Sequence, residues 1–430
     1  MRRKVLVSGK IIERDVAPRR VWDLYANRVV PYWIAHLKPW AISHAWVAWK
    51  DRVDVMTPIN GREWPVPMPK DANLDLIRIE MLNARLTWAP YIDTQYVWLD
   101  VACLRQEGGE GEHVRLEEWK LDVPTIGCVY EHAYPFVVCY FNGLGRPLHL
   151  PPGYFQSDRC WFRRAWTLQE ITDDAIIGGE TGNDVMDTEV RGRFDESMVS
   201  LQRKRLSRSI LDLVSEMQHR ESTKPLDKVA GLVYLLETKS IPIYDTQLSA
   251  AEAWEVLVDV MDTWFRGQLF LFYPEPGDGS KYWCPSWNQL MEYKAIAPGF
   301  TGFPGDVWRM NNPGADLFVP AGSNIRLGNV GGLSEVPKEP IPRQGELVLN
   351  DDIGVPHTLI IVADHAHPIP DGLYTVLGGF TSTSRTEHWI VGQLTEDGMF
   401  KKLSVFRSVG SELPRLRQLT SQEPVELFLC

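Results

Sequence analysis

The sequence predicts an α/β fold in its N-terminal part, followed by a helical region and a β-rich C-terminal region. Short, almost wholly apolar segments alternate with helical patterns as far as about residue 180. Apolar residues at helical spacing then dominate 195–265. Beyond about residue 300, glycine and proline become frequent between short alternating or β-branched runs. These changes define a capping segment at 1–38, an α/β domain at 39–180, a helical region at 181–299 and a β-rich region at 300–430.

The composition is typical of a globular protein: of 430 residues, 44% are hydrophobic and 23% charged. A net charge of −11 argues against nucleic acid as a partner, because phosphate binding requires a basic face. No apolar run approaches the roughly 20 residues of a membrane helix, and no secretory signal follows the basic start. Six cysteines without a C-x-x-C pair indicate reduced, buried thiols. We therefore expect a cytoplasmic protein that does not act on membranes.

The first elements follow from apolar runs and turn residues. Residues 19–25 predict a short helix or turn that caps the core, and 40–45 predict an apolar strand. Four prolines within 58–70 predict a loop without regular structure. Asp71 is a suitable N-cap for the helix that follows, in which apolar residues recur at helical spacing.

Two more strands are predicted at 96–100 and 136–140. Both segments are largely apolar, as expected where both faces of a sheet are covered. The Gly/Glu-rich stretch 107–113 predicts a mobile loop, and Pro124 suits the first turn of a helix that runs to about Ala133. Strands that alternate with helices predict a parallel sheet with right-handed crossovers.

The rest of the chain changes from helical to strand patterns. One apolar stripe runs from Leu201 to Met217 and another from Ala251 to Trp264. The C-terminal strands are predicted at Glu346–Leu349, Thr358–Val362, Leu373–Leu377, Trp389–Gln393, Leu403–Phe406 and Val425–Leu429.

Polar side chains follow the predicted parallel strands. Ser43 and His44 end the first strand, Asp100 ends the second and Asn142 follows the third. Ligand sites of open α/β sheets lie at the carboxyl ends of the strands, so these residues form a candidate site. The alternative for Ser43 and Asp100 is that each caps the helix after it.

The segment Cys160–Glu170 places a carboxylate near a large aromatic side chain. Read as a helix, Trp166 and Glu170 are four residues apart and share a face, with Arg163 and Arg164 just upstream. A carboxylate beside an aromatic wall can bind a sugar or a cationic ring. The alternative is an amphipathic helix whose Glu170 pairs with a neighbouring arginine, because ion-pair networks hold carboxylates in the same way.

Four segments, taken in order, resemble the fungal heterokaryon-incompatibility (HET) domain. They cover roughly residues 39–171 and are Pro39–Trp46, Tyr96–Gln106, the stretch from Glu117 to Ala133, and the Arg-Ala-Trp-Thr-Leu-Gln-Glu block that ends at Glu170. Two later segments, Arg220–Val229 and Trp283–Trp287, are similar to stretches that commonly follow this domain in longer members.

The resemblance implies a fold and a reaction. HET domains are thought to be distantly related to TIR domains, so it implies a TIR-like, flavodoxin-like parallel sheet with flanking helices. In catalytic TIR domains a glutamate after a Trp-Cys-x-x-Glu-like pattern supports cleavage of the nicotinamide–ribose bond of NAD⁺. Trp166-Thr-Leu-Gln-Glu170 looks like that pattern, with Thr167 in place of the cysteine. The resemblance therefore implies that Glu170 is the catalytic carboxylate.

The same resemblance assigns roles to the neighbouring residues. A fixed carboxylate stabilises the oxocarbenium character that develops on the ribose. Trp46 or Trp166 would stack on a ring, and Arg163 or Arg164 would bind the diphosphate. NAD⁺ or a related nucleotide is then a substrate, and no other cofactor or metal is expected. The family further implies a role in non-self recognition and cell death, switched on by self-association.

The chain departs from the common HET pattern at two positions. Arg105 stands where an acidic residue is frequent, and Val47 where a glycine is frequent after the first strand. Two alternatives to an NAD⁺ hydrolase therefore stay open. One is a non-catalytic recognition module that signals by assembly, and the other is an enzyme acting on another small molecule in the same place.

Other chemistries have little support in the sequence. No G-x-S-x-G elbow, phosphate-binding G-x-x-x-x-G-K-[ST] loop or H-E-x-x-H motif is present. Asp364-His-Ala-His367 contains a set of metal-ligand types, but a further ligand is missing from the pattern. A nucleophile pair of His44 with Cys103 or Cys160 has no support in the spacing.

Overall fold

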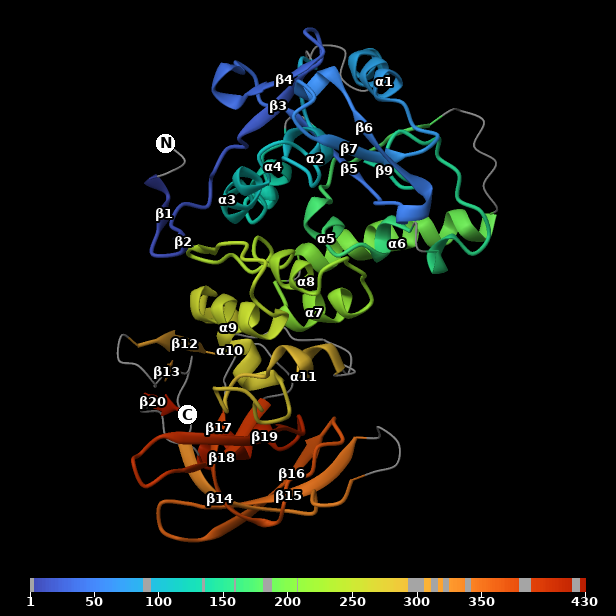
Figure 1. Cartoon of the computed structure of the whole chain (residues 1–430). Coiled ribbons are helices and arrows are strands. Elements are labelled where there is room, and N and C mark those ends of the chain that lie inside the picture. Colours follow the sequence, from blue (N-terminus) through green and yellow to red (C-terminus); the bar gives the residue numbers. More distant parts are fainter. Residues whose placement is uncertain are drawn as a thin grey trace. The chain divides into compact units, whose positions relative to one another are not determined.

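The computed structural model describes most of the chain, including the whole predicted site (Figure 1). The described residues are 4–87, 94–133, 136–157, 160–180, 188–206, 208–292, 305–310, 316–319, 325–336, 342–378, 388–419 and 426–430.

The chain forms two compact units. Unit 1 comprises 1–208 and 219–260, and unit 2 comprises 209–218 and 261–430. Unit 1 has a mixed sheet with helices, helices dominate the middle of the chain, and the C-terminal part is largely antiparallel sheet. The predicted order of an α/β region, a helical region and a β-rich region is therefore confirmed. Within the described residues, no helix combines the length and apolar character needed to cross a membrane.

The main sheet of unit 1 has six strands in the order β10-β9-β5-β8-β3-β4. Parallel pairing joins β10 to β9, β9 to β5 and β5 to β8, whereas β3 pairs antiparallel with both β8 and β4. The strands are β3 (Arg20–Asp23), β4 (Arg28–Pro31), β5 (Trp40–His44), β8 (Tyr96–Trp98), β9 (Val137–Tyr140) and β10 (Ile176–Ile177). The predicted strands at 40–45, 96–100 and 136–140 are confirmed, and the sheet is mixed instead of wholly parallel.

The prediction of a helix or turn at 19–25 is wrong. Residues Arg20–Asp23 form β3, which joins β4 through a tight turn in which Asn27 has a φ of 48°. Val21 and Trp22 are fully buried in the sheet. Two arginines at the start of this segment obscured the strand pattern, and their guanidinium groups instead bind carboxylates on α3 (Glu112–Asp122).

The proline-rich stretch 58–70 is more regular than predicted. A 3-10 turn, η4 (Pro58–Asn60), precedes β7 (Pro65–Pro69), which pairs antiparallel with β6 (Arg52–Met56). The prolines of β7 alternate along the strand, and β7 has a single partner strand. Alternate residues of such an edge strand have no inter-strand hydrogen bond to donate, so proline is tolerated there.

The N-cap of α1 (Leu74–Thr87) is Asn73 instead of the predicted Asp71. The Asn73 side-chain oxygen accepts a 2.8 Å hydrogen bond from the backbone N–H of Asp75. Asp71 pairs with Arg146 at 2.7 Å. Aspartate and asparagine both cap helices well, so the local sequence does not distinguish Asp71 from Asn73 as the N-cap. The difference is the tertiary contact of Asp71 with Arg146.

The remaining elements of unit 1 are a small sheet, 3-10 turns and helices that lie outside this sheet (Figure 1). A small antiparallel sheet consists of β1 (Leu6–Val7), β2 (Lys10–Ile11) and β11 (Ile241–Pro242). The other 3-10 turns are η2 (Tyr32–Ile34), η3 (Trp49–Asp51), η5 (Tyr154–Gln156) and η6 (Trp161–Arg163). The other helices are α2 (Asp100–Cys103), α4 (Ile126–Glu131), α5 (Thr167–Glu170), α6 (Thr188–Leu206), α8 (Leu226–Ala230) and α9 (Ala250–Val260).

Unit 2 packs helices against a nine-stranded sheet. Its helices are α7 (Ile210–Gln218), α10 (Thr263–Phe272), α11 (Trp287–Glu292) and α12 (Leu413–Leu419). Its strands are β12 (Asp306–Arg309), β13 (Asp316–Val319), β14 (Ile325–Gly331), β15 (Arg343–Asn350), β16 (Pro356–Ala363), β17 (Gly372–Gly378), β18 (His388–Leu394), β19 (Phe400–Ser408) and β20 (Leu427–Leu429). The six predicted C-terminal strands correspond to β15–β20, although Val425 lies outside the described residues. All pairings are antiparallel except that of β19 with β20.

Candidate functional site

The pairing of β5 with both β8 and β9 brings the ends of these strands together. All five residues of β5 are buried, and β5 runs parallel to its neighbours, with Ala41 opposite Trp98 and Ser43 opposite Cys139. Ser43 and His44 therefore emerge at the same edge of the sheet as Asp100, which begins α2 directly after β8. The predicted convergence of these three residues is confirmed, whereas Asn142 makes no hydrogen bond to them among the described residues.

Glu170 lies at this edge and is bound through one carboxylate oxygen. Ser43 Oγ donates a 2.5 Å hydrogen bond to Glu170 Oε2, and the indole N–H of Trp161 donates to Ser43 Oγ at 2.8 Å. Because the serine oxygen accepts from Trp161, its single proton is directed to Glu170. In the described part of the chain, no hydrogen bond to Glu170 Oε1 accompanies this contact, so that oxygen stays available for a proton or a ligand.

A buried arginine holds the short helix α5 that carries Glu170. Arg220 is 1% exposed and donates to the carbonyl oxygen of Arg164 and to Thr167 Oγ1, at 2.7 and 2.8 Å. Thr167 Oγ1 in turn donates to the carbonyl of Trp161 at 2.7 Å. The position of the Glu170 carboxylate thus depends on the contact between Thr167 and Arg220, which are 53 residues apart in the sequence. Helix α5 also packs on β5.

Burial shifts the ionisation of Glu170 toward neutral pH. Glu170 is 7% exposed, and this desolvation raises its pKa to about 7. The hydrogen bond from Ser43 and the charges of His44 and Arg220 lower the pKa, whereas the negative charge of Asp100 raises it. The carboxyl group therefore changes its charge close to neutral pH, as expected of a candidate acid–base or charge-stabilising group.

A second carboxylate, Asp100, is bound by three donors. His44 Nε2 lies 2.8 Å from Asp100 Oδ1, the indole N–H of Trp46 donates to Oδ2 at 3.0 Å, and the backbone N–H of Val101 donates to Oδ1 at 2.7 Å. Burial alone would raise the pKa of Asp100, but His44, Trp46 and Val101 together lower it. Burial would lower the pKa of His44, but the charges of Asp100 and Glu170 raise it overall. The pair therefore favours a protonated histidine beside an ionised aspartate.

The other predicted site residues lie in different contacts. The guanidinium group of Arg163 binds Glu221 and the carbonyl oxygen of Gln156. Arg164 contributes its backbone carbonyl to Arg220. Trp166 is the N-cap residue of α5, and its side chain hydrogen bonds to Asp227. The described contacts therefore group Ser43, His44, Trp46, Asp100 and Glu170.

Trp161, Arg220 and Tyr130 also support the site, and the sequence patterns did not single them out for it. Tyr130 donates from its hydroxyl to the carbonyl oxygen of Ile42, one residue before Ser43, at 3.0 Å. Trp161 and Ser43 are separated by 118 residues. The sequence around Trp161 predicts only that this residue is buried in the core, and it gives no indication of a contact with Ser43.

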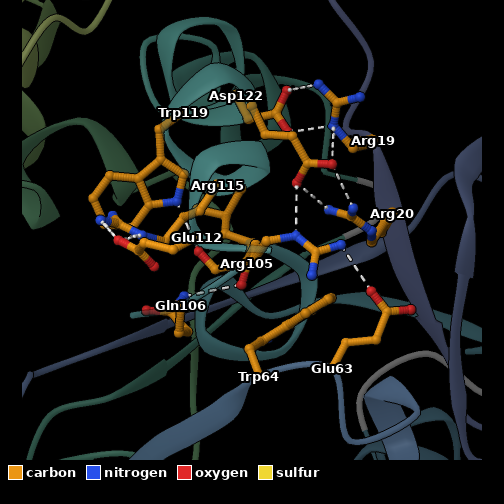
Figure 2. A network of polar contacts seen from close by, with 12 residues as sticks. Arg19, Arg20, Glu63, Trp64, Arg105, Gln106, Glu112, Arg115, Trp119 and Asp122 are labelled. Carbon is orange, nitrogen blue, oxygen red and sulfur yellow. Dashed lines mark hydrogen bonds and ion pairs between the residues drawn. The ribbon is translucent and has the colours of Figure 1, made fainter. Parts of the chain in front are cut away.

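Arg105, which departs from the common HET pattern, belongs to a separate ion network (Figure 2). Its guanidinium group lies 2.7 Å from Glu63 and 3.7 Å from Glu118, and it covers the ring of Trp64 at 4.9 Å. The adjacent Gln106 donates to the carbonyl oxygens of Leu104 and Asp100. Arg105 therefore stabilises the segment after Asp100, while its charge is directed to Glu63 and Glu118.

The Asp364-His-Ala-His367 set has other contacts. Asp364 binds Arg407 through both carboxylate oxygens, and His365 Nε2 lies 2.6 Å from the carbonyl oxygen of Val405. Burial lowers the pKa of His365 to about 4. These contacts are those of a buried structural histidine and an ion pair.

Replacing Asp100 by asparagine is expected to lower the pKa of His44, because the facing negative charge is lost. Titration of the His44 ring by NMR measures the shift. Asp54→Asn is the matched control, since Asp54 is exposed and its one ion-pair partner among the described residues is Arg52, at 3.5 Å. An unchanged pKa of His44 in Asp100→Asn would contradict the ion pair.

Comparison with known proteins gives no assignment: no protein-family model, no curated protein and no solved structure matches the chain.

Proposed function

We propose that residues 39–171 form a HET-type, distantly TIR-like domain that cleaves the nicotinamide–ribose bond of NAD⁺ or a related nucleotide. The observation that carries this proposal is Glu170, a buried carboxyl group with a pKa of about 7 and one oxygen bound by Ser43 at the carboxyl end of β5. In the cell, the reaction would act in cytoplasmic non-self recognition and cell death of a fungus.

The chemistry requires charge stabilisation more than acid catalysis. As the bond between the ribose carbon and the nicotinamide nitrogen breaks, the bonding electrons neutralise the pyridinium ring, and positive charge develops on the ribose. Ionised Glu170 stabilises that charge from a low-dielectric position. Water then adds to the ribose carbon and releases one proton, giving nicotinamide and the ADP-ribose product.

Neighbouring residues have roles that fit this reaction. Asp100 is kept ionised by His44 and Trp46, and its negative charge is paired with protonated His44 near Glu170. The Trp46 ring is fixed by its hydrogen bond to Asp100, it stacks with the His44 ring, and the Arg52 guanidinium group lies over it, so a heterocycle that stacks on Trp46 would compete with these groups. Ser43 orients Glu170 by directing its proton to one carboxylate oxygen.

The test is nicotinamide release from NAD⁺, followed by chromatography at low and high protein concentration. Wild-type protein is expected to release nicotinamide, and Glu170→Gln is expected to lose at least about 100-fold in rate, as seen when a transition-state-stabilising group is removed. Glu117→Gln, which changes an exposed glutamate on α3, is the control and keeps the wild-type rate. Equal rates for wild type and Glu170→Gln would remove Glu170 from the mechanism.

A second candidate is a non-catalytic recognition module that acts by assembly. Two observations favour it: Arg163 is engaged with Glu221, and Trp33 and Trp49 are each 83% exposed. Exposed tryptophans are frequent at interaction surfaces. This candidate predicts concentration-dependent association measured by light scattering, weakened in Trp33→Ala or Trp49→Ala and unchanged in Glu170→Gln.

A further inference from the structure

Three side chains of metal-ligand types meet beside α4. Cys128 lies on α4, and His132 is the residue directly after the end of this helix. Because the two residues are four apart, their side chains lie on the same face of α4. Asp15 comes from the segment between β2 and β3. Cys128 Sγ is 3.6 Å from His132 Nδ1, and His132 Nε2 is 3.7 Å from Asp15 Oδ1. One ligand atom from each residue lies within 4.8 Å of the others.

We propose that Asp15, Cys128 and His132 form a binding site for a single zinc ion. A thiolate, an imidazole nitrogen and a carboxylate are the ligand types that zinc prefers. Ligands bound to a tetrahedral zinc at roughly 2.0–2.3 Å are separated by roughly 3–4 Å. The 3.7 Å between His132 Nε2 and Asp15 Oδ1 lies in this range, and one ligand atom from each of the three residues lies within 4.8 Å of the others. The proposal is independent of the reaction at Glu170.

The hydrogen bond of the histidine supports metal binding. His132 Nδ1 lies 3.0 Å from the backbone carbonyl of Cys128 and donates to it. This contact leaves a lone pair on Nε2, the nitrogen nearest Asp15. Metal-binding histidines are commonly oriented by such a bond from the other ring nitrogen. A lone pair facing a carboxylate is favourable only when a cation, either a proton or a metal ion, lies between them.

Exposure and charge are also suitable for a metal ion. The side chains of His132 and Asp15 are 43% and 78% exposed, whereas Cys128 is buried. An ion can therefore enter from solvent, and water can supply a fourth ligand. Glu131 adds negative charge near Cys128, and the nearby Arg14 is engaged with Glu131 and with the backbone and ring of Tyr234.

Zinc at this position would connect the segment before β3 to α4. The same helix carries Tyr130, which binds the carbonyl of Ile42 next to Ser43. Zinc binding is therefore expected to stabilise unit 1, since an ion that binds only the folded state raises its stability by mass action. Burial raises the pKa of Cys128 to about 11, with smaller contributions from Asp15 and Glu131, so zinc must displace the thiol proton.

The experiment titrates the full chain, purified with a reductant and stripped of metal, with Zn²⁺ by calorimetry and with Co²⁺ by absorption. We expect one ion per chain, release of about one proton, a thiolate-to-cobalt charge-transfer band and a higher melting temperature with zinc. Cys128→Ser and His132→Gln are each expected to weaken binding at least about tenfold and to remove the cobalt band or change it. Asp15→Asn is expected to weaken binding less, because Asp15 is the most exposed ligand.

Cys430→Ser is the matched control, because Cys430 is a partly exposed free thiol in unit 2. It is expected to bind zinc like the wild type. The wild-type cobalt spectrum reports thiolate ligation without any substitution, so poor folding of a variant does not obscure the answer. The proposal is overturned if wild type binds no stoichiometric zinc, or if Cys128→Ser and His132→Gln bind it as tightly as wild type.

Discussion

Replacing Glu118 by alanine is expected to destabilise unit 1 by about 3–5 kcal/mol, because it leaves the largely buried guanidinium group of Arg20 without its carboxylate. Glu118 is 9% exposed. Arg20 binds both oxygens of Glu118, at 2.7 and 3.0 Å, and Arg19 and Arg105 each lie 3.7 Å from Glu118. Arg20 and Arg105 also lie over the ring of Trp64, so the carboxylate fixes β3, α3 and the segment after α2 together.

Chemical denaturation of Glu118→Ala and of a control variant on the same helix measures the change in the free energy of unfolding. Glu117→Ala is the matched control, because Glu117 is 72% exposed and, within the described part of the chain, its one ion-pair partner is Lys120, three residues away. Exposed pairs of this kind contribute roughly 0.5 kcal/mol or less. Equal stability of Glu118→Ala and Glu117→Ala would show that the network does not stabilise the fold.

Glu118 also predicts how stability changes in acid. Burial alone would raise its pKa, but the hydrogen bonds and charge of Arg20, with the charges of Arg19 and Arg105, lower it overall. The folded carboxyl group thus releases its proton at lower pH than the unfolded one. Its contribution is present above the unfolded pKa of about 4.3 and is lost as the pH falls through the folded pKa. The stability difference between wild type and Glu118→Ala is therefore expected to shrink below about pH 4.

Replacing Glu170 by glutamine is expected to stabilise the protein above pH 7 while it removes nicotinamide release. The pKa of Glu170 is raised to about 7 by burial, so the unfolded carboxyl group ionises first as the pH rises. The folded state loses stability from the unfolded pKa of about 4.3 up to about pH 7, to a total of about 4 kcal/mol. Glutamine does not ionise and can still accept the hydrogen bond from Ser43.

Denaturation of wild type and Glu170→Gln at a series of pH values measures this effect. The two proteins are expected to be similar near pH 4, and the variant is expected to be the more stable at pH 8. Gain of stability with loss of activity is the behaviour of a residue kept for function. A variant that is less stable than wild type at every pH would instead indicate that Glu170 is a structural ion-pair partner.

The sequence predicted those parts of the site that depend on where strands end. The apolar runs before Ser43 and Asp100 show the ends of β5 and β8, and parallel pairing then brings these residues together. The two arginines of the site segment were not predictable in the same way. Arg163 binds Glu221, which lies 58 residues away, and nothing in the local pattern indicates that partner.

Individual elements of the fold were mispredicted where tertiary contacts override the local sequence signal. Arg20 and the prolines of β7 are unfavourable for strands on their own, but Arg20 pairs with Glu118 and the prolines of β7 occupy an edge. The buried Arg220 illustrates the same limit, because arginine usually reads as a surface residue. In each case the deciding partner lies far away in sequence.

The most direct test of the central claim is the pH dependence of kcat/KM for nicotinamide release from NAD⁺. With ionised Glu170 as the charge-stabilising group, the rate is expected to rise tenfold per pH unit below about pH 7 and to level off above it, since the pKa of Glu170 is about 7. The residual rate of Glu170→Gln is expected to lack this rise. Absence of nicotinamide release from wild type at every pH and protein concentration, or a rise retained in Glu170→Gln, would contradict the account.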